Sequence, residues 1–436
     1  MPSRSVPSSK RARRRDGGGA PPAGRADMEP AAAVETAGEP APASRHDGGG
    51  APPAGWADME RAAVQAAADP HGARQRASAP APDGARAPPQ RPTASGLDGV
   101  LAAETALSDV DGEGGHLTLR GHAVEEIAPR ATFEDACALF LGGTSADARV
   151  RLGDARARAH RLHVDGDAME RLRVHLAQPG AEAPWDAIGL LPVALAPEGA
   201  RPDPSVSHAR DLLRMLRSVA PTDDEVRALD TYLVTVIDHG MNASTFAARV
   251  VASTGSDLRS CLTAGIGALK GPLHGGAPGP VLDMLDAVRE PARARSWIEA
   301  KLDAGEKIMG MGHRIYRVRD PRAFVLERAI ERLGRSPRLE LARIVEREAE
   351  AALARRHPER ALKANVEFFT AVLLEAVGID RTLFSSVFAC SRVVGWCAHV
   401  GEQRQFGKLI RPASRYVGPR VRQEEEATTT TSSSLR

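Results

Sequence analysis

The sequence has little of several features that mark common protein classes. Aromatic residues make up only 4% of its 436 positions, and its four cysteines are far apart (Cys137, Cys261, Cys390 and Cys397). Because no two cysteines have the short spacing of a metal-binding pair and all are scattered, the sequence argues against a disulfide scaffold or a zinc ribbon and fits a reducing compartment. No apolar run reaches the roughly 18 residues of a membrane span, and no secretory pattern follows the N-terminus. A net charge of only +2 gives no general attraction for nucleic acid. We therefore expect a cytoplasmic chain that binds neither nucleic acid nor membranes.

Residues 1–95 lack the apolar side chains of a core. They are rich in Ala, Pro, Gly and Arg, and Asp16–Glu29 recurs almost unchanged as Asp47–Glu60. Two copies without apolar periodicity indicate a duplicated linker rather than a solenoid. Six basic residues and no acid among the first fifteen are compatible with a targeting or nucleic-acid segment, but a solvated basic tail is the simpler interpretation. We expect disorder in 1–95 and in 421–436.

Residues 96–420 are predicted to form a predominantly helical body. Alanine has the lowest helix cost, and apolar residues recur at about every 3.6 positions. Thr222 and Glu225 form a capping box before an apolar stripe that ends at Ile237. The exception is 111–115, a tight turn between short extended segments. Further helices are expected near 281–289, 294–304, 321–334, 338–355 and 365–377.

Three histidines lie beside glycines, where the backbone allows a ligand to approach closely. They are His239 before Gly240, His274 before Gly275, and His313 after Gly312. Arginines form a second group, and a guanidinium can hold a carboxylate through two parallel hydrogen bonds. The candidates are Arg322, Arg392 and Arg411. Each residue alone is as well explained by a solvated or capping role. Together they predict a site for a small dicarboxylate.

Glu367 is the candidate acid, because it stands between Val366 and Phe368. Apolar surroundings raise the pKa of a carboxyl group and make its carboxylate a stronger base. An exposed helix glutamate is the alternative. The sequence has no P-loop, no dinucleotide-binding glycine pattern and no His-Glu-x-x-His zinc motif. We expect neither a metal nor a redox cofactor. The stretch Met309–Gly312 is only a weak phosphate-loop signal, although basic residues lie near it.

With these residues in view, the chain resembles citrate synthases of the shorter bacterial and archaeal type from Gly96 to about Arg420. The likeness is strongest in Asp238–Arg249, Lys270–Ala277, Ile308–Tyr316 and Arg392–Gln403. It implies a mainly α-helical homodimer with a large domain, a small domain at about 275–375, and an active site between them. It also implies condensation of oxaloacetate with acetyl-CoA to give citrate and CoA, with acyl-CoA as a substrate rather than a cofactor.

The resemblance also assigns roles to residues. His274 would stabilise the enol of acetyl-CoA, His313 would polarise the ketone, and Glu367 would be the base. Oxaloacetate would be bound by His239, Asn242, Arg322, Arg392 and Arg411. CoA would be bound by Lys307, Met309, Gly310, Met311, Gly312, Arg314 and Asn365.

The sequence also departs from the family pattern. Glu367 stands where the family usually has Asp, Pro278 where it often has Asn, and 140–210 matches poorly. Three hypotheses follow. The first is a citrate synthase, or a 2-methylcitrate synthase that uses propionyl-CoA; the two substrates differ by one methylene, worth about 1–3 kcal/mol. The second is a protein that keeps the oxaloacetate pocket but turns over slowly. The third is a separate interaction role for the basic N-terminal arm.

Overall fold

The structure is a computed structural model that describes residues 97, 99–217, 219–274 and 278–418. The chain divides into two units, Met1–Pro92 and Thr93–Arg436, and the described residues all belong to the second. The predictions of disorder in 1–95 and 421–436, and of a role for the N-terminal arm, concern residues outside the described ranges. The expected small domain at 275–375 stays a prediction.

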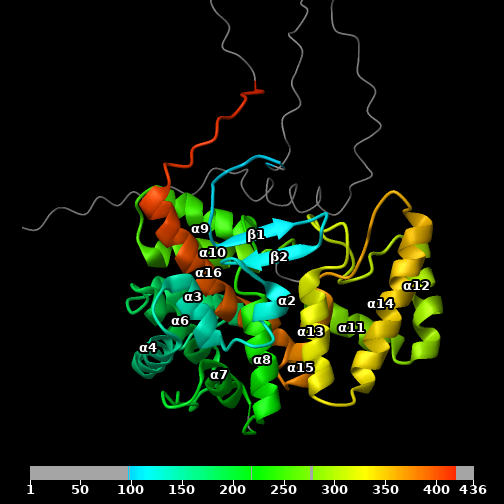
Figure 1. Cartoon of the computed structure of the whole chain (residues 1–436), viewed down its shortest axis with the longest axis horizontal. Helices are drawn as coiled ribbons and strands as arrows, with labels where there is room; N and C mark the ends of the chain where they lie inside the picture. The colour runs from blue at the N-terminus through cyan, green and yellow to red at the C-terminus, as the bar shows by residue number, and fades with distance from the viewer. Residues whose placement is uncertain (1–96, 98, 218, 275–277, 419–436) are drawn as a thin grey trace, which may run out of the picture. The chain divides into compact units, whose positions relative to one another are not determined.

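The described body is predominantly helical, as predicted (Figure 1). It opens with an antiparallel three-stranded sheet of order β1–β2–β3, formed by Ser108–Asp111, His116–Leu119 and His122–Ala123. The turn predicted at 111–115 joins β1 to β2, in a register that pairs Ser108 with Leu119 and Asp111 with His116.

The helices up to His274 follow this sheet along the chain. They are α2 (Val124–Ile127), α3 (Phe133–Leu141), α4 (Ser145–Arg158), α5 (Ala168–Ala177), α6 (Pro184–Leu195), α7 (His208–Leu216), α8 (Asp223–Thr235), α9 (Ala243–Ser253) and α10 (Leu258–Lys270). The second set comprises the helices from Pro278 onward: α11 (Pro278–Val288), η3 (Pro291–Arg293), α12 (Ala294–Asp303), α13 (Pro321–Arg332), α14 (Pro337–Arg356), α15 (Val366–Ala376), η4 (Arg381–Leu383) and α16 (Phe384–Phe406). All five helices that the sequence predicted after residue 280 are present, with ends shifted by a few residues.

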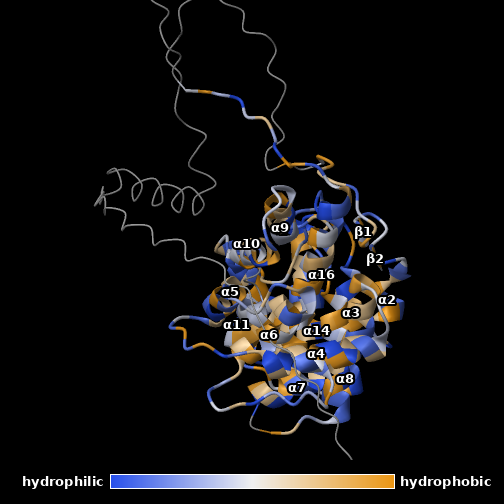
Figure 2. Cartoon of the chain, turned by 90° about the vertical axis from the view of Figure 1, so that its left-hand side faces the viewer, coloured by the Kyte–Doolittle hydropathy of each residue, from blue (hydrophilic) through white to orange (hydrophobic). Residues whose placement is uncertain are grey.

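Helix α16 is the central packing element. It contacts α3, α5, α6, α8, α9 and α10, and α3, α6, α9 and α10 lie beside it in Figure 1. Among the described residues, Arg381–Phe406 is the one stretch long and apolar enough to cross a membrane by length and composition, a match that the sequence analysis overlooked. Because 83% of its most apolar window is buried in the protein, we interpret it as a core helix. Many of the other helices carry both hydrophobic and hydrophilic residues (Figure 2), as expected for helices with one face toward the core.

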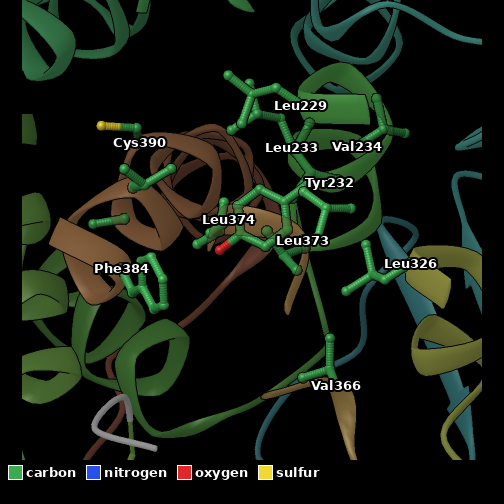
Figure 3. Packing of buried hydrophobic residues seen from close by; sticks show 14 of the residues in the cluster. Leu229, Tyr232, Leu233, Val234, Leu326, Val366, Leu373, Leu374, Phe384 and Cys390 are labelled. Carbon is green, nitrogen blue, oxygen red and sulfur yellow. The ribbon is translucent and has the colours of Figure 1, made fainter. Parts of the chain in front are cut away.

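One continuous apolar core connects the two sets of helices. Figure 3 shows part of it, where Leu229 and Leu233 of α8 lie near Leu373 and Leu374 of α15, with Phe384 of α16 beside them. Helix α13 packs against both α8 and α15. The loops that precede α9, α13 and α15 are therefore held on rigid supports.

Helix α8 begins as the sequence predicts. The Thr222 side chain accepts a hydrogen bond from the Glu225 amide, and the Glu225 carboxylate accepts one from the Thr222 amide. This reciprocal cap satisfies two amides that have no partner within the helix.

Replacing Thr222 by Ala should lower the free energy of unfolding by about 1 kcal/mol, because the helix loses its cap. Urea denaturation measures the change. Thr222→Ser keeps the hydroxyl and serves as the control, and equal stability of all three proteins would contradict the capping role.

Candidate active site

The first histidine lies in the short loop between α8 and α9. Gly240 has a φ of +57°, a backbone conformation that favours glycine, and Asn242 caps α9 by accepting the Thr245 amide hydrogen bond. His239 is buried, and its Nε2 lies 3.2 Å from the Tyr316 hydroxyl. Burial, together with the charges of Arg322 and Arg392, holds the pKa of His239 well below its ordinary value. The ring is therefore neutral at physiological pH.

The second histidine lies in the loop between α12 and α13. The His313 Nδ1 accepts hydrogen bonds from the backbone amides of Ile315 and Tyr316, both at 3.1 Å. An Nδ1 that accepts cannot carry a proton, so the neutral ring carries its proton on Nε2. Burial and the Arg322 charge lower the pKa of His313 to about 4. The His313 ring stands edge-on to His239, with centroids 5.5 Å apart. This histidine is a fixed N–H donor.

The third histidine, His274, lies just after α10 and contacts the first turn of α9. Its Nε2 is 3.2 Å from the Ser244 amide, which donates to it, and 2.8 Å from the Ser244 hydroxyl. A backbone N–H cannot face a second N–H, so His274 carries its proton on Nδ1. Burial and the Arg392 charge lower its pKa to about 4. His274 is thus a second neutral donor, and its neighbour Ser244 also accepts from Trp396 at 3.2 Å.

Glu367 occupies the first turn of α15 and is tied to the His313 loop. Asn365 caps this helix by accepting the Glu367 amide at 3.0 Å, and its side chain donates to the Gly312 carbonyl at 2.9 Å. Burial raises the pKa of Glu367 to about 7, against the lowering effect of the Arg322 charge. The apolar neighbours in the sequence predicted this direction. Such a carboxyl group is well suited to acid–base chemistry near neutral pH.

Two buried arginines connect these groups. Arg322 donates twice to Asp320, from Nε at 3.0 Å and from NH2 at 2.7 Å, and its charge acts on His239, His313 and Glu367. Arg392 donates from Nε to the Val236 carbonyl at 2.8 Å and stacks on Phe388. Its NH2 is buried without a hydrogen-bond partner among the described residues. Burial lowers the pKa of Arg392 to about 10. A buried, unsatisfied donor of this kind fits an anionic ligand.

Arg411 is placed apart from this group. It is exposed in the extended segment after α16 and lines a cavity of about 740 Å³ together with Phe246, Phe406 and residues 102–106. No hydrogen bond or ring contact joins it to the three histidines within the described residues.

The residues predicted to bind CoA lie around the loop that carries His313. Gly310 and Gly312 have φ values of +73° and +89°. The loop is held by hydrogen bonds to residues 363–365, including one from the Gly312 amide to the Lys363 carbonyl at 2.6 Å. Met309 and Met311 pack against the core, while Lys307 and Arg314 are exposed. A role in CoA binding stays a prediction for all of them.

The sequence analysis gave no role to several residues that shape this site. The Tyr316 ring contacts two of the histidines: its centroid lies 4.7 Å from that of His313, in a tilted arrangement, and 5.6 Å from that of His239, edge-on. Asp320 pairs with Arg322 and also accepts the Val366 amide at 3.2 Å. Both follow His313 closely in the sequence, but neither carries a signal of its own. Among the described residues, no cluster of three His, Cys, Asp or Glu side chains has the arrangement of a metal site.

These features define a predominantly helical protein with a polar site built from neutral histidines, buried guanidiniums and a desolvated carboxyl group. A family model, "Citrate synthase, C-terminal domain", matches residues 96–180 and 193–413. The chain belongs to the citrate synthase family. The match leaves out residues 181–192. These residues lie within 140–210, the region whose sequence resembles the family pattern least.

Individual relatives agree with this placement. The citrate synthase of Deinococcus radiodurans is 35% identical over 367 residues, covering 75% of this chain and 96% of its own. The 2-methylcitrate synthase of Mycobacterium tuberculosis is 35% identical over 360 residues, covering 74% and 90%. The crystal structure of citrate synthase from Thermotoga maritima aligns with a TM-score of 0.67 at 32% identity, covering 76% and 97%.

The environment of Glu367 predicts an effect of pH on stability. A carboxyl group whose pKa is raised by folding keeps its proton longer in the folded state, so its burial destabilises the protein as the pH rises from about 4.5 to 7. Glu367→Gln removes this cost. Between pH 4 and pH 8, the wild type should lose about 3 kcal/mol more unfolding free energy than the variant. Urea unfolding of both proteins at each pH measures the difference, and parallel pH profiles would contradict the burial of this charge.

Proposed function

We propose that this protein condenses acetyl-CoA with oxaloacetate and hydrolyses the resulting thioester, releasing citrate and free CoA. The observation that carries the proposal is the combination of one carboxyl group of raised pKa, Glu367, with two histidines held as neutral donors on opposite ring nitrogens, His313 and His274. Forming an enol and adding it to a ketone requires these groups: one base and two hydrogen-bond donors.

The first step is removal of a proton from the thioester methyl group by the Glu367 carboxylate. The pKa of such a methyl group lies far above that of any side chain, so the developing enolate oxygen must be stabilised at the same moment. In the proposal, His274 donates its Nδ1–H to that oxygen. A fixed, neutral donor suits this task because it needs no reorganisation during the reaction.

In the second step, the enol carbon attacks the ketone carbon of oxaloacetate and forms the new carbon–carbon bond. His313 donates its Nε2–H to the ketone oxygen, and Arg322, Arg392 and Arg411 hold the carboxylates, with His239 and Asn242 beside them. Water then cleaves the thioester and releases the CoA thiol. Holding both substrates in place contributes on the order of 7–11 kcal/mol. The chemistry is acid–base throughout, so the proposal includes neither a metal nor a redox cofactor.

We extend the proposal to an acyltransferase of the tricarboxylic acid cycle that acts as a cytoplasmic homodimer. Support for a second copy comes from the end of α16 and the segment after it, where Phe406, Leu409 and Val417 are each more than half exposed among the described residues. A segment with several exposed apolar side chains is suited to packing against another surface. Arg411 lies within the same segment, apart from the other carboxylate-binding candidates.

Two alternatives compete with this proposal. The similarity to a 2-methylcitrate synthase favours propionyl-CoA as a second candidate substrate. Glu367 favours the other alternative, a slow enzyme or binding protein, because one extra methylene moves the carboxylate by about 1 Å and can cost about a hundredfold in rate.

Release of CoA from each acyl-CoA tests the proposal. Purified protein with oxaloacetate and acetyl-CoA should release thiol at an ordinary enzymic rate, on the order of 1–1,000 per second, and faster than with propionyl-CoA. A preference for propionyl-CoA would overturn the citrate assignment. Negligible release with both, restored by Glu367→Asp, would support the slow-turnover alternative instead.

The division of roles predicts a second result. His274→Ala should lower condensation by roughly a hundredfold or more, the effect of removing one donor to a developing oxyanion, while leaving oxaloacetate affinity unchanged. Calorimetric titration with oxaloacetate and the thiol assay measure the two effects. Loss of oxaloacetate binding in this variant would show that the role of His274 is misassigned.

A further inference from the structure

The β1–β2 hairpin contacts two of the three loops that carry the histidines of the site, those of His239 and His313. On the first loop, the Ser108 hydroxyl donates to the Asp238 carboxylate at 2.6 Å and accepts the Gly240 amide at 2.8 Å. These two residues flank His239 in the chain. One hydroxyl group thus holds the backbone on both sides of the imidazole, and the side chain of Val110 on the same strand lies against Gly240.

The turn of the same hairpin holds the second loop. The Gly112 carbonyl accepts a hydrogen bond from the Arg317 amide at 2.8 Å. A Cβ atom on Gly112 would stand only 2.5 Å from the Ile315 carbonyl oxygen, and one on Gly115 would stand 2.4 Å from a methyl group of Val318. At positions 112 and 115 the turn therefore lies too close to residues 315–318 for a side chain to fit without movement, and these residues begin two positions after His313.

The segment that leads into the hairpin is held by residues of α9 and α16. The Glu402 carboxylate accepts the Ala106 amide at 2.9 Å and an Arg249 NH1 hydrogen bond at 2.6 Å. Arg249 also donates to the His399 Nδ1 at 2.9 Å, which leaves the proton on Nε2 to donate to Asp238 at 3.2 Å. The buried Asp238 side chain is thus held by Ser108 from the hairpin and by His399 from α16.

We propose that Ser108 is a positioning residue for oxaloacetate binding, and that the β1–β2 hairpin sets the spacing of the His239 and His313 loops. The inference rests on the proposed function, because it takes these two histidines as the side that faces oxaloacetate. Ser108 acts through the backbone of residues 238–240 and does not itself contact the substrate.

The geometry makes this role separable from acyl-CoA chemistry. His274 is held by Ser244 of α9, and Glu367 is held by Asn365 at the start of α15. Neither of these supports includes a residue of the hairpin. Loss of the Ser108 contacts, which reach only residues 238–240, should therefore affect oxaloacetate and spare acetyl-CoA, whereas a general loss of stability would affect both.

Ser108→Ala tests the inference. In the full-length protein, this variant should raise the oxaloacetate Kd and KM at least tenfold and leave the acetyl-CoA KM within twofold of the wild type. Thr118→Ala is the matched control, because Thr118 belongs to the same sheet but pairs with Asp109, on the face opposite to Ser108. It should bind oxaloacetate like the wild type. Calorimetry with oxaloacetate and steady-state thiol release provide the constants.

Every result decides something. An unchanged oxaloacetate Kd in Ser108→Ala, or an equal rise in both KM values, would overturn the inference while leaving the proposed function intact. A wild type that does not bind oxaloacetate would refute the proposed function, and the inference with it. If Ser108→Ala does not fold, Gly112→Ala provides the second test, since it displaces residues 315–318 and should raise the oxaloacetate Kd. An unchanged Kd in that variant would overturn the inference.

Discussion

The site depends on two buried guanidinium groups, one of which lacks a full set of hydrogen-bond partners within the part of the chain that the structure describes. Arg322 donates to the Asp320 carboxylate, but Arg392 donates to a carbonyl oxygen, interacts electrostatically with Asp238, and has an Nη2 with no partner among the described residues. Buried charge is costly unless it is paired. The buried Arg392 Nη2 is therefore a donor to which a carboxylate of a small dianion could bind.

Burial and, after it, the same positive charge favour the neutral form of the surrounding histidines. Burial and the two guanidiniums lower the pKa values of His239, His274 and His313, so the imidazoles remain neutral where an isolated histidine would be partly charged. A neutral imidazole has one donor and one acceptor nitrogen, and backbone amides that donate to one nitrogen determine which tautomer is present. The amides of residues 315 and 316 fix one ring, and the amide of Ser244 fixes another. The chemistry of the side chains is thus set by main-chain geometry.

Much of this arrangement could be predicted from the sequence, and the reasons for success and failure are physical. The capping box at Thr222, the turn at 111–115 and the helices after residue 280 are local features, determined by residues close together in the chain. The apolar neighbours of Glu367 correctly indicated the direction of its pKa. The contacts of Ser108 and Asp320 could not be found in this way. Ser108 meets Asp238 across 130 positions of sequence, and a serine in a short strand carries no signal of such a contact.

Arg411 shows the opposite limit, because the family resemblance assigns it a role but no hydrogen bond or ring contact among the described residues joins it to the other carboxylate-binding candidates. It lies in an exposed extended segment after α16, so its neighbours in the sequence give no indication of where its guanidinium group binds.

Glu367 raises the remaining question of geometry. The start of α15 is fixed to the His313 loop through the Asn365 side chain and through hydrogen bonds between residues 310–312 and 363–365. The backbone that carries the carboxylate therefore cannot retreat by the length of the extra methylene without breaking these bonds. Close packing of Phe368 against Gly310, where even a Cβ would stand 2.9 Å from the ring, opposes the same movement. The difference in reach must be absorbed by the Glu367 side chain or by the acyl group that it meets, so the shape of the acyl pocket and the identity of the base are linked in this protein.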